Sequence, residues 1–347
     1  MAKVKLGFLG VGYMGQNAHL SNYVQLDNCE VAAIAEKRAE LGKLAAQRYG
    51  IPHIYATCAE MMENEQIDAI VAAQSYRNHG NIIREIAVYG KPVLTEKPLC
   101  LSVEEGEKIV AIEKEHGVIH MVGYHKRSDP ASEYAKKVVD EWKSTGEFGK
   151  MKYVRVVMPP GDWVGGAPKV IQTDETYPQF DIEPAPSDMS PEKGKAYDVF
   201  VNYYIHQVNY LRFMLGEDYV VDYADPSGVL LAAKSASGVC GVIEMAPWEN
   251  TVDWQESVLV AFEHGYVKVE LPAPLASQLP GRVTVMKDNK TESGFFSPFL
   301  PKVSAMRNQA KNFVSVALGE KEPPCGSVEA LRDLEIARDY INAFYKG

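Results

Sequence analysis

The sequence predicts an α/β protein of two domains. The first is a Rossmann domain with a parallel, doubly wound sheet, and the second is an α+β domain with a large, mainly antiparallel open sheet. The chain has 347 residues, more than the roughly 250–300 at which a single hydrophobic core stops growing. Short β-branched runs alternate with helical patterns up to about residue 125, whereas several strand-like runs follow one another beyond about residue 226. The first pattern is typical of βαβ units and the second of antiparallel sheets.

The first domain, residues 1–124, is predicted from strand-like segments that alternate with helical ones. Two segments have helical periodicity and end at a glycine suited to a left-handed C-terminal cap, "RAELGKLAAQRYG" and "VEEGEKIVAIEKEHG". The strands that we expect between and around them are "KVKLGFLG", "CEVAAIAE", "DAIVAAQ", "PVLTEK" and "VIHMVGYH".

The second domain, residues 125–347, begins with an amphipathic helix in "PASEYAKKVVDEW" and a strand in "KMKYVRVVM". A tract from about 159 to 196 then holds seven prolines. A loop of this length is either functional or a disordered linker, and its aromatic residues favour an ordered lid-like insertion. Strands punctuated by Gly and Asn follow, and two amphipathic helices occupy about 303–347.

Composition excludes several partners. A formal net charge of -10 and the absence of a Lys/Arg block argue against nucleic acid. No apolar run approaches the roughly 20 residues that span a bilayer, and the N-terminal residues enter a strand directly, which leaves no room for a signal peptide. The five cysteines form no C-x-x-C pair and are expected to be reduced, buried thiols. We therefore expect a cytoplasmic globular protein.

A cofactor motif lies at the end of the first strand. "GFLGVGYMG" contains G-x-G-x-x-G at Gly10, Gly12 and Gly15. Glycines at this spacing allow a tight turn and let the backbone approach a pyrophosphate at a helix N-terminus. A glycine-rich turn without a ligand is the alternative. The backbone positions expected nearest the phosphates are Val11, Tyr13 and Met14.

The end of the second strand bears on the choice of dinucleotide. Glu36 stands 21 residues after Gly15, where an acidic side chain binds the adenosine ribose and repels a 2′-phosphate. Lys37 and Arg38 follow it and could accept a 2′-phosphate if Glu36 turned away. The sequence therefore favours NAD and leaves NADP open.

Two segments suggest catalysis. In "GKPVLTEKPL", Lys97 follows a strand and precedes Pro98, which favours an extended conformation, permits a cis bond and directs the lysine away from the sheet. A surface lysine at a strand end is the alternative. In "VFVNYYIHQVNYL", a single histidine, His206, lies in an aromatic, β-branched run, where a histidine is more often part of the core than of a site.

Taken together, these motifs resemble the glucose–fructose oxidoreductase / inositol dehydrogenase (Gfo/Idh/MocA) family. The resemblance covers nearly the whole chain, and members are mostly NAD(P)-dependent enzymes that oxidise or reduce a hydroxyl or keto centre on sugars, cyclitols and their derivatives. The matching segments, in the family's order, are the glycine motif, "GKPVLTEKPL", "GYHKRSDPA", "GEFGKMKYV", "NYYIHQVNYLRFMLG" and "NFVSVALGEKEPPCGSVEALRDLEIARDYI".

The resemblance implies roles for particular residues. Lys97 matches the family's catalytic lysine, His206 its catalytic histidine and Glu96 an acidic residue near the nicotinamide-side ribose. Arg127 and Pro130 match an R-x-x-P motif, although Ser128 stands where an aromatic residue is usual.

A further match near the cofactor departs from the family's pattern. His79 matches a histidine that a proline usually precedes by four residues, and here Ser75 stands at that position, with Gln74 before it. The resemblance thus adds Gln74, Ser75 and His79 to the residues expected near the cofactor. The departure puts the fine contacts with the cofactor in doubt, and not the binding itself.

The largest departure lies beside His206. Many members carry an Asp four residues before this histidine and another three after it, where this chain has Asn202 and Asn209. On a helix these positions share one face. An Asn can orient the imidazole or bind a sugar hydroxyl, but without a carboxylate His206 should be less easily protonated. Asp198 could substitute in part, and both asparagines could be ordinary polar residues of a helix face.

The resulting prediction is an NAD(P)-dependent oxidoreductase that transfers a hydride between nicotinamide and a secondary hydroxyl or keto centre, which includes oxidation at C3 of a sugar. His206 would act as general acid/base with Asn202 beside it, and Lys97 would stabilise the developing alkoxide. The insertion favours a bulky glycoside, with stacking on Trp163, Tyr177 and Phe180. Further residues expected to line the substrate pocket are Tyr124, His125, Arg127, Tyr203, Tyr204 and Asn209.

Two other functions remain open. One is an NAD-dependent glycoside hydrolase that transfers and returns the hydride, and the other is a non-catalytic NAD-binding regulatory protein, which only the loss of Asp at position 202 favours. No histidine spacing suggests a metal site. We expect a homodimer or homotetramer, because a broad open sheet leaves one face to be covered.

Overall fold

The computed structural model describes residues 3–291 and 293–346. They divide into two compact units. The first unit runs up to Tyr124, where we expected the Rossmann domain to end, and it also contains residues 167–189 and 306–334, which the sequence analysis placed in the second domain. The second unit consists of residues 125–166, 190–305 and 335–347.

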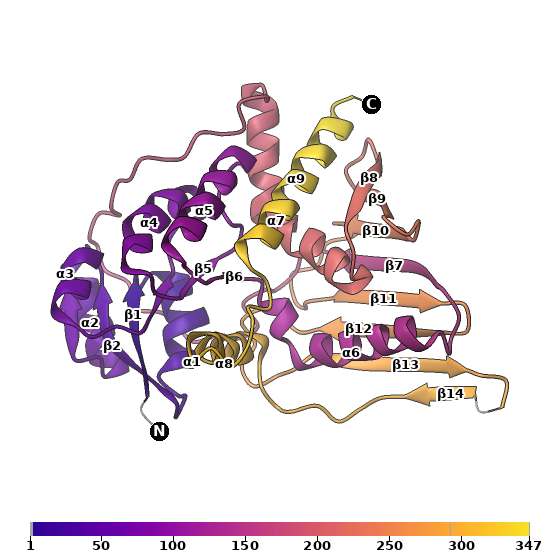
Figure 1. The fold of residues 1–347 in the computed structure, drawn as a ribbon, viewed down its shortest axis with the longest axis horizontal. Coiled ribbons are helices and arrows are strands. Elements are labelled where there is room, and N and C mark those ends of the chain that lie inside the picture. Colours follow the sequence, from indigo (N-terminus) through magenta and orange to yellow (C-terminus); the bar gives the residue numbers. More distant parts are fainter. Residues whose placement is uncertain (1–2, 292, 347) are drawn as a thin grey trace. The chain divides into compact units, whose positions relative to one another are not determined.

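The first unit is built on a six-stranded parallel sheet (Figure 1). Its strand order, β3-β2-β1-β4-β5-β6, is that of a doubly wound nucleotide-binding fold, as the alternating pattern predicts. Only β3, three residues long and largely exposed, had no signal in the sequence. The strands are β1 (Val4–Leu9), β2 (Cys29–Ala35), β3 (His53–Tyr55), β4 (Ala69–Ala72), β5 (Val93–Glu96) and β6 (His120–Gly123).

The helices of this unit begin and end at the expected kinds of residue. Ser102 accepts a hydrogen bond from the Glu105 N–H at the start of α5, and Gly50 and Gly117 cap α2 and α5 with φ of 68° and 67°. Two short helices, α3 and α4, were not predicted. After the glycine motif the chain forms a π-helical stretch, Gly15–Leu20. The helices are α1 (Ser21–Tyr23), α2 (Ala39–Tyr49), α3 (Cys58–Asn64), α4 (His79–Ile86), α5 (Val103–His116) and α8 (Ala305–Ala317).

The second unit is built on an eight-stranded sheet in the order β14-β13-β12-β11-β7-β10-β9-β8. The sheet is mainly antiparallel, as expected, but β10 pairs with β7 in parallel. A parallel pair needs a long connection, which here includes helix α7. The strands are β7 (Met151–Met158), β8 (Tyr219–Ala224), β9 (Leu230–Ser235), β10 (Cys240–Met245), β11 (Glu256–Phe262), β12 (Gly265–Leu271), β13 (Arg282–Asp288) and β14 (Ser293–Phe296).

Three helices complete the second unit: α6 (Pro130–Thr145), α7 (Pro191–Leu215) and most of α9 (Ser327–Phe344). Trp142 of α6 packs edge-on against Phe262 of β11, with ring centroids 5.2 Å apart. Along β11 and β12, side chains alternate between buried and half-buried, so one face of the sheet forms the core and the other stays partly open.

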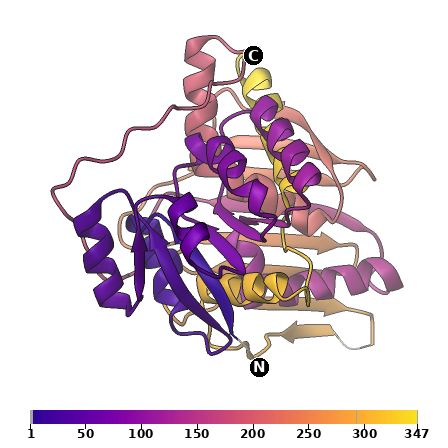
Figure 2. The same ribbon diagram turned by 60° about the vertical axis from the view of Figure 1, so that its left-hand side comes forward.

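The segment of residues 167–189, which we call the strap, has neither helix nor strand (Figure 2) and belongs to the first unit. Ile171 contacts the apolar core beneath the parallel sheet. The irregular tract ends where α7 begins, at Pro191, and thus slightly before the predicted boundary. The strap belongs to the first unit because its side chains and backbone bind there.

The structure corrects one prediction about the cysteines. Four of them are buried, but Cys240, at the start of β10, is exposed. Within the part of the chain that the structure describes, no group of His, Cys, Asp and Glu is arranged to hold a metal ion. No helix there has both the length and the apolarity that crossing a membrane requires.

Candidate functional site

The glycine motif forms a tight turn at the carboxyl end of β1. Gly10 has a φ of 85°, which side chains other than glycine rarely adopt. A Cβ at Gly10 would lie 2.8 Å from the Gln74 Nε2 atom, and one at Gly15 would lie 2.7 Å from the Gly10 carbonyl oxygen. Around Gly12 there is more room, because its nearest neighbour would be Arg38 at 3.7 Å. The turn is therefore close-packed on the protein side and open where a phosphate would approach.

A cavity of about 380 Å³ adjoins this turn. It lies at the carboxyl ends of β1, β2 and β4, the edge of a doubly wound sheet at which nucleotides bind. Six of the predicted cofactor positions line it: Gly10, Gly12, Glu36, Lys37, Arg38 and Gln74. The lining also includes Thr57, Asn78, Asn81 and Glu85 and the strap residues from Tyr177 to Asp181, none of which the sequence indicated as cofactor contacts.

Glu36 is held in place by neighbours on the same corner. Its Oε2 accepts the Val11 N–H at 3.0 Å, and Arg38 donates to Oε1 from Nε at 2.8 Å and to Oε2 from Nη2 at 3.0 Å. Burial would raise the pKa of Glu36, but these hydrogen bonds outweigh it and leave the pKa below its ordinary value. Glu36 is thus an ionised carboxylate at the end of β2, and Arg38 is already paired with it.

Other predicted cofactor residues lie outside the lining of this cavity. His79 is fully buried in α4, and its Nδ1 lies 3.0 Å from the Leu99 carbonyl oxygen. Burial lowers the pKa of His79 to about 4, so its imidazole is neutral near pH 7. The remaining residues of this group are Val11, Tyr13, Met14, Gly15, Ser75, Glu96 and Lys97.

Lys97 stands directly after β5, beside a buried acidic residue. The Lys97–Pro98 bond is cis, and the Lys97 N–H donates to Glu96 Oε2 at 3.3 Å. The other oxygen of Glu96 lies 2.7 Å from His19 Nε2. His19 comes from the π-helical stretch after the glycine motif, where irregular helices often mark functional sites. Sequence reasoning missed His19, because nothing in its spacing singles it out.

The strap is docked at its beginning by the same π-helical stretch. The buried Gln16 donates to the carbonyl oxygens of Val11 at 2.9 Å and Ile171 at 3.0 Å, and its Oε1 accepts the Ile171 N–H at 2.9 Å. Further along, the Arg38 guanidinium lies over the Tyr177 ring, 5.1 Å from its centroid. Tyr177 and Phe180 line the cavity beside the glycine motif. The structure thus places at the nucleotide edge two aromatic residues that we expected to stack on the substrate.

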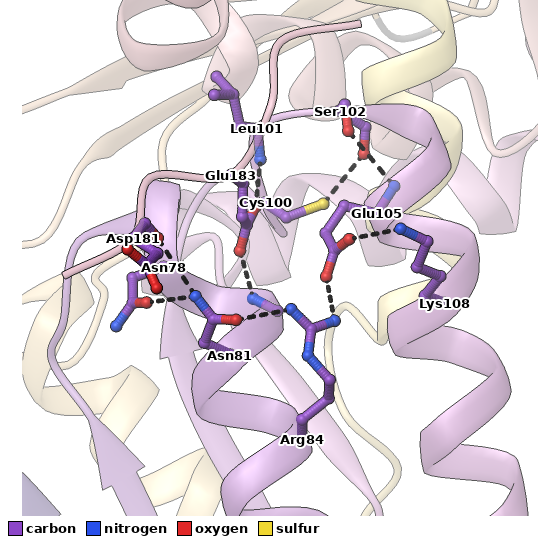
Figure 3. Close-up of polar contacts among 11 residues, drawn as sticks. Asn78, Asn81, Arg84, Cys100, Leu101, Ser102, Glu105, Lys108, Asp181 and Glu183 are labelled. Atoms are coloured by element: carbon purple, nitrogen blue, oxygen red, sulfur yellow. Dashed lines mark hydrogen bonds and ion pairs between the residues drawn. The ribbon is translucent and has the colours of Figure 1, made fainter. Parts of the chain in front are cut away.

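The far end of the strap is fixed by Glu183 (Figure 3). Its carboxylate accepts the Gly80 N–H at 2.5 Å and the Leu101 N–H at 3.2 Å, while its own N–H donates to the Arg77 carbonyl oxygen. Asn81 reaches the Asp181 carbonyl oxygen at 3.2 Å. Burial raises the pKa of Glu183, although the two backbone hydrogen bonds oppose the rise. The strap is therefore bound on both sides of the stretch that lines the cavity.

In the second unit, helix α7 presents the predicted catalytic histidine. His206 is half-buried, and the rings of His206 and His125 meet edge to face with centroids 4.7 Å apart. Asn202 is exposed, whereas Asn209 is buried and its Oδ1 accepts a hydrogen bond from Arg127 Nε at 2.6 Å. All three residues lie on α7 as expected, but Asn202 is exposed and Asn209 is buried against Arg127.

A buried polar cluster next to this face escaped the sequence analysis. Glu256 pairs with Lys126 and accepts hydrogen bonds from Gln207 at 2.6 Å and from the Trp254 indole at 3.2 Å. Burial lowers the pKa of Lys126, and the charge of Glu256 opposes that shift. This cluster joins the residue after His125 to the residue after His206 through Glu256.

The other predicted substrate residues are spread over both units. Trp163 lines an open hollow with Glu249, Asn250 and Thr251, and Tyr203 is exposed on α7 next to Tyr204, with ring centroids 5.1 Å apart. Tyr124 is buried at the end of the first unit. Within the second unit, Trp163 and Tyr203 are thus exposed aromatic surfaces that a sugar ring could use.

Comparison with known proteins agrees with this geometry. Residues 4–124 match the family described as "Oxidoreductase family, NAD-binding Rossmann fold". A scyllo-inositol 2-dehydrogenase (NAD(+)) of Bacillus subtilis is 26% identical over 257 residues, which are 70% of this chain and 67% of that protein. A myo-inositol 2-dehydrogenase of Thermotoga maritima is 23% identical over 65% of this chain and 58% of its own length.

Among solved structures, an aldose-aldose oxidoreductase from Caulobacter crescentus superposes with a TM-score of 0.72 at 18% identity, over 99% of this chain and 98% of that chain. A likeness at this identity concerns the fold, and it extends over both units. The sequence match, the glycine turn and Glu36 identify residues 4–124 as the NAD-binding Rossmann domain of a Gfo/Idh/MocA-type oxidoreductase, and the relatives named here are dehydrogenases.

Proposed function

We propose that the protein is an NAD-dependent dehydrogenase that oxidises a secondary hydroxyl of a sugar, glycoside or cyclitol. The observation that carries the proposal is the cavity at Gly10 and Gly12 with the ionised Glu36 on its wall. It fits a dinucleotide with a free ribose 2′-hydroxyl, because a carboxylate accepts hydrogen bonds from hydroxyl groups. The inositol dehydrogenases among its relatives support a polyhydroxylated substrate.

NAD supplies the hydride acceptor when it is bound. Lys97 would donate a hydrogen bond to the substrate oxygen and stabilise its developing negative charge. His206 would take the hydroxyl proton on its imidazole, whose ordinary pKa suits neutral pH. Glu96, held by His19, would position the segment that carries Lys97.

The surroundings of His206 bear on its proton transfer. The rings of His125 and His206 meet edge to face, and asparagines occupy positions 202 and 209. Oxidation of a hydroxyl requires His206 to accept the proton as a neutral base. Arg127 donates a hydrogen bond to Asn209 of the same helix.

The substrate class follows from the exposed aromatic residues. Trp163 and Tyr203 suit stacking on a sugar face, and Asn202 suits a hydrogen bond to a sugar hydroxyl. Oxidation at C3 of a glycoside is the specific reaction that we propose to test first. Self-association into a homodimer or homotetramer through the partly open sheet face remains a prediction, which sedimentation of the intact chain would check.

A second candidate is the glycoside hydrolase that returns the hydride. The strap favours it, because a segment fixed at both ends beside the nucleotide cavity should slow cofactor exchange. An enzyme that regenerates its cofactor in each cycle has no need for such exchange. The two candidates share their cofactor site and differ in whether reduced nicotinamide accumulates.

The test is the absorbance of reduced nicotinamide after NAD is mixed with a panel of sugars, cyclitols and glycosides, alongside an assay for released aglycone. His206→Ala should lower kcat by roughly 10²–10⁴, and Lys97→Met should do the same. The exposed His264 provides a matched control in His264→Ala, which should keep full activity.

Aglycone release without reduced cofactor would favour the hydrolase. A chain that binds NAD but turns over nothing on the panel would contradict both candidates. If His206→Ala kept wild-type activity, the assignment of the general base would be wrong.

A further inference from the structure

The strap carries a carboxylate to the start of helix α2. Glu175 accepts the Glu40 N–H on Oε1 at 3.0 Å and the Leu41 N–H on Oε2 at 2.9 Å. The residue at the usual capping position, Arg38, makes no side-chain cap. A residue 135 positions away in sequence therefore satisfies the first N–H groups of this helix, where the helix dipole favours negative charge.

This corner is where NAD and NADP differ. The 2′-position of the adenosine ribose lies at the end of the second strand of such a fold, near the acidic residue of that strand. A 2′-phosphate is bound by a nearby arginine and by backbone N–H groups at a helix N-terminus. In this chain the corresponding groups are Arg38, which lines the cavity, and the first turn of α2, which begins at the next residue.

Both of these anion-binding groups already hold a carboxylate of the chain. Glu36 takes the Arg38 guanidinium with two hydrogen bonds, and Glu175 takes the start of α2. Burial would raise the pKa of Glu175, but its two backbone hydrogen bonds outweigh that and, helped by Thr173 and the charge of Arg38, lower the pKa. Glu175 is therefore ionised near neutral pH.

We propose that Glu175 of the strap is a specificity-determining residue that excludes the 2′-phosphate of NADP and so commits the enzyme to NAD. A 2′-phosphate would have to displace Glu175 from the α2 N-terminus or remain beside two carboxylates with the exposed Lys37, and not Arg38, as its cation. The ribose 2′-hydroxyl of NAD meets neither obstacle. The inference rests on the cofactor site proposed above and deepens it.

The position of Glu175 is set by the structure around it. Gln16 holds the strap four residues earlier, at Ile171, and the Tyr177 ring covers Arg38 two residues later. Thr173 Oγ1 donates to the Glu175 carboxylate at 2.9 Å. A long exposed side chain would otherwise swing into solvent, whereas here it has a fixed partner at each oxygen.

The experiment is calorimetric titration of the intact chain with NAD and with NADP, so that its readout is binding and not turnover. The wild type should bind NAD at least tenfold more tightly than NADP. In Glu175→Gln, which keeps an acceptor oxygen for the helix, the Kd for NADP should fall tenfold or more while the Kd for NAD changes less than threefold.

Two control variants separate the effect of the Glu175 charge from the effect of holding the strap in place. Asp174→Asn removes a charge from the neighbouring exposed residue of the strap and should change neither affinity. Glu183→Gln weakens the far anchor of the strap and should change both affinities by the same factor. Raising the salt concentration should reduce the ratio of the NADP Kd to the NAD Kd more in the wild type than in Glu175→Gln, which retains only the Glu36 carboxylate, because salt screens charges near the surface.

An unchanged NADP affinity in Glu175→Gln, with NAD still bound, would overturn this inference alone. Equal weakening of both dinucleotides in that variant would also overturn it, because Glu175 would then be only a structural cap. A wild type that bound neither dinucleotide would overturn the proposed function and the inference with it.

Discussion

Glu175 and Glu183 belong to one strap and make the same kind of contact, yet their environments shift their pKa values in opposite directions. Each accepts two backbone N–H groups, one or both from the start of a helix. Burial dominates at Glu183 and raises its pKa, with Glu105 nearby adding to the rise. At Glu175 the same hydrogen bonds prevail and the pKa falls. Hydrogen bonds to the backbone therefore do not fix the charge of a carboxylate, which depends on what surrounds it.

The variant expected to have the largest effect on this comparison removes the buried carboxylate, Glu183. Glu183→Ala leaves the Gly80 and Leu101 N–H groups without their acceptor in the interior, at a cost of about 1–3 kcal/mol each. We expect a loss of unfolding free energy on the order of 3 kcal/mol, measured by urea denaturation. Glu183→Gln, which keeps one acceptor oxygen, should lose clearly less. If Glu183→Ala unfolded like the wild type, the strap would not be anchored there.

A second test uses pH, since the two carboxylates titrate in different windows. An acid whose pKa is raised on folding favours the folded state below its ordinary pKa of 4.5, and that contribution is lost as the pH rises through the folded value. For Glu175 the pKa is lowered, so its contribution is present above 4.5 and is lost as the pH falls through the folded value.

The measurement is the unfolding free energy against pH for the wild type and for the two Gln variants. The difference between wild type and Glu183→Gln should change on the neutral side of 4.5, and that between wild type and Glu175→Gln on the acid side. Arg84 and Glu105 also face Glu183, and Arg38 faces Glu175, so these partners must be retained. If the difference from the wild type changed over the same pH range in both variants, the two carboxylates would not have oppositely shifted pKa values.

The smallest effect concerns stability at neutral pH. Glu175 lies near the surface, and Glu175→Gln keeps an acceptor for α2, so losing the charge should lower the midpoint of thermal unfolding only slightly at neutral pH. Because the same variant is expected to change the affinity for NADP, a large fall in the midpoint would mean that Glu175 serves the fold more than cofactor selection. Circular dichroism during heating would decide this.

The sequence predicted what local pattern encodes. The parallel sheet follows from alternating periods, the glycine turn from its spacing, and the caps at Gly50 and Gly117 from single residues. It indicated an ordered insertion, but it could not predict where the strap binds. Gln16 and Ile171 are 155 residues apart, and Glu183 and Gly80 are 103 apart, so no window of the chain contains both partners of either contact.

The aromatic residues of the strap show the same limit in another form. Tyr177 and Phe180 were expected to stack on the substrate, and the structure places them in the lining of the cavity beside the glycine motif. Aromatic residues in a polar loop indicate that the loop is ordered. Which pocket they line depends on the tertiary path of the backbone, which the sequence pattern does not give. His19 carried no signal at all, because a histidine four residues after Gly15 is not part of any spacing that chemistry requires.

The strap has a consequence for how the protein is made. The nucleotide-binding unit is assembled from three stretches of chain, and its cavity takes lining residues from as far as Asp181. A nascent chain that has released only the first 124 residues holds the glycine turn but lacks the strap. The cavity lining is therefore complete only after residue 181 has been released, and the whole unit only after residues 306–334, so we expect stable NAD binding to follow the last of these stretches.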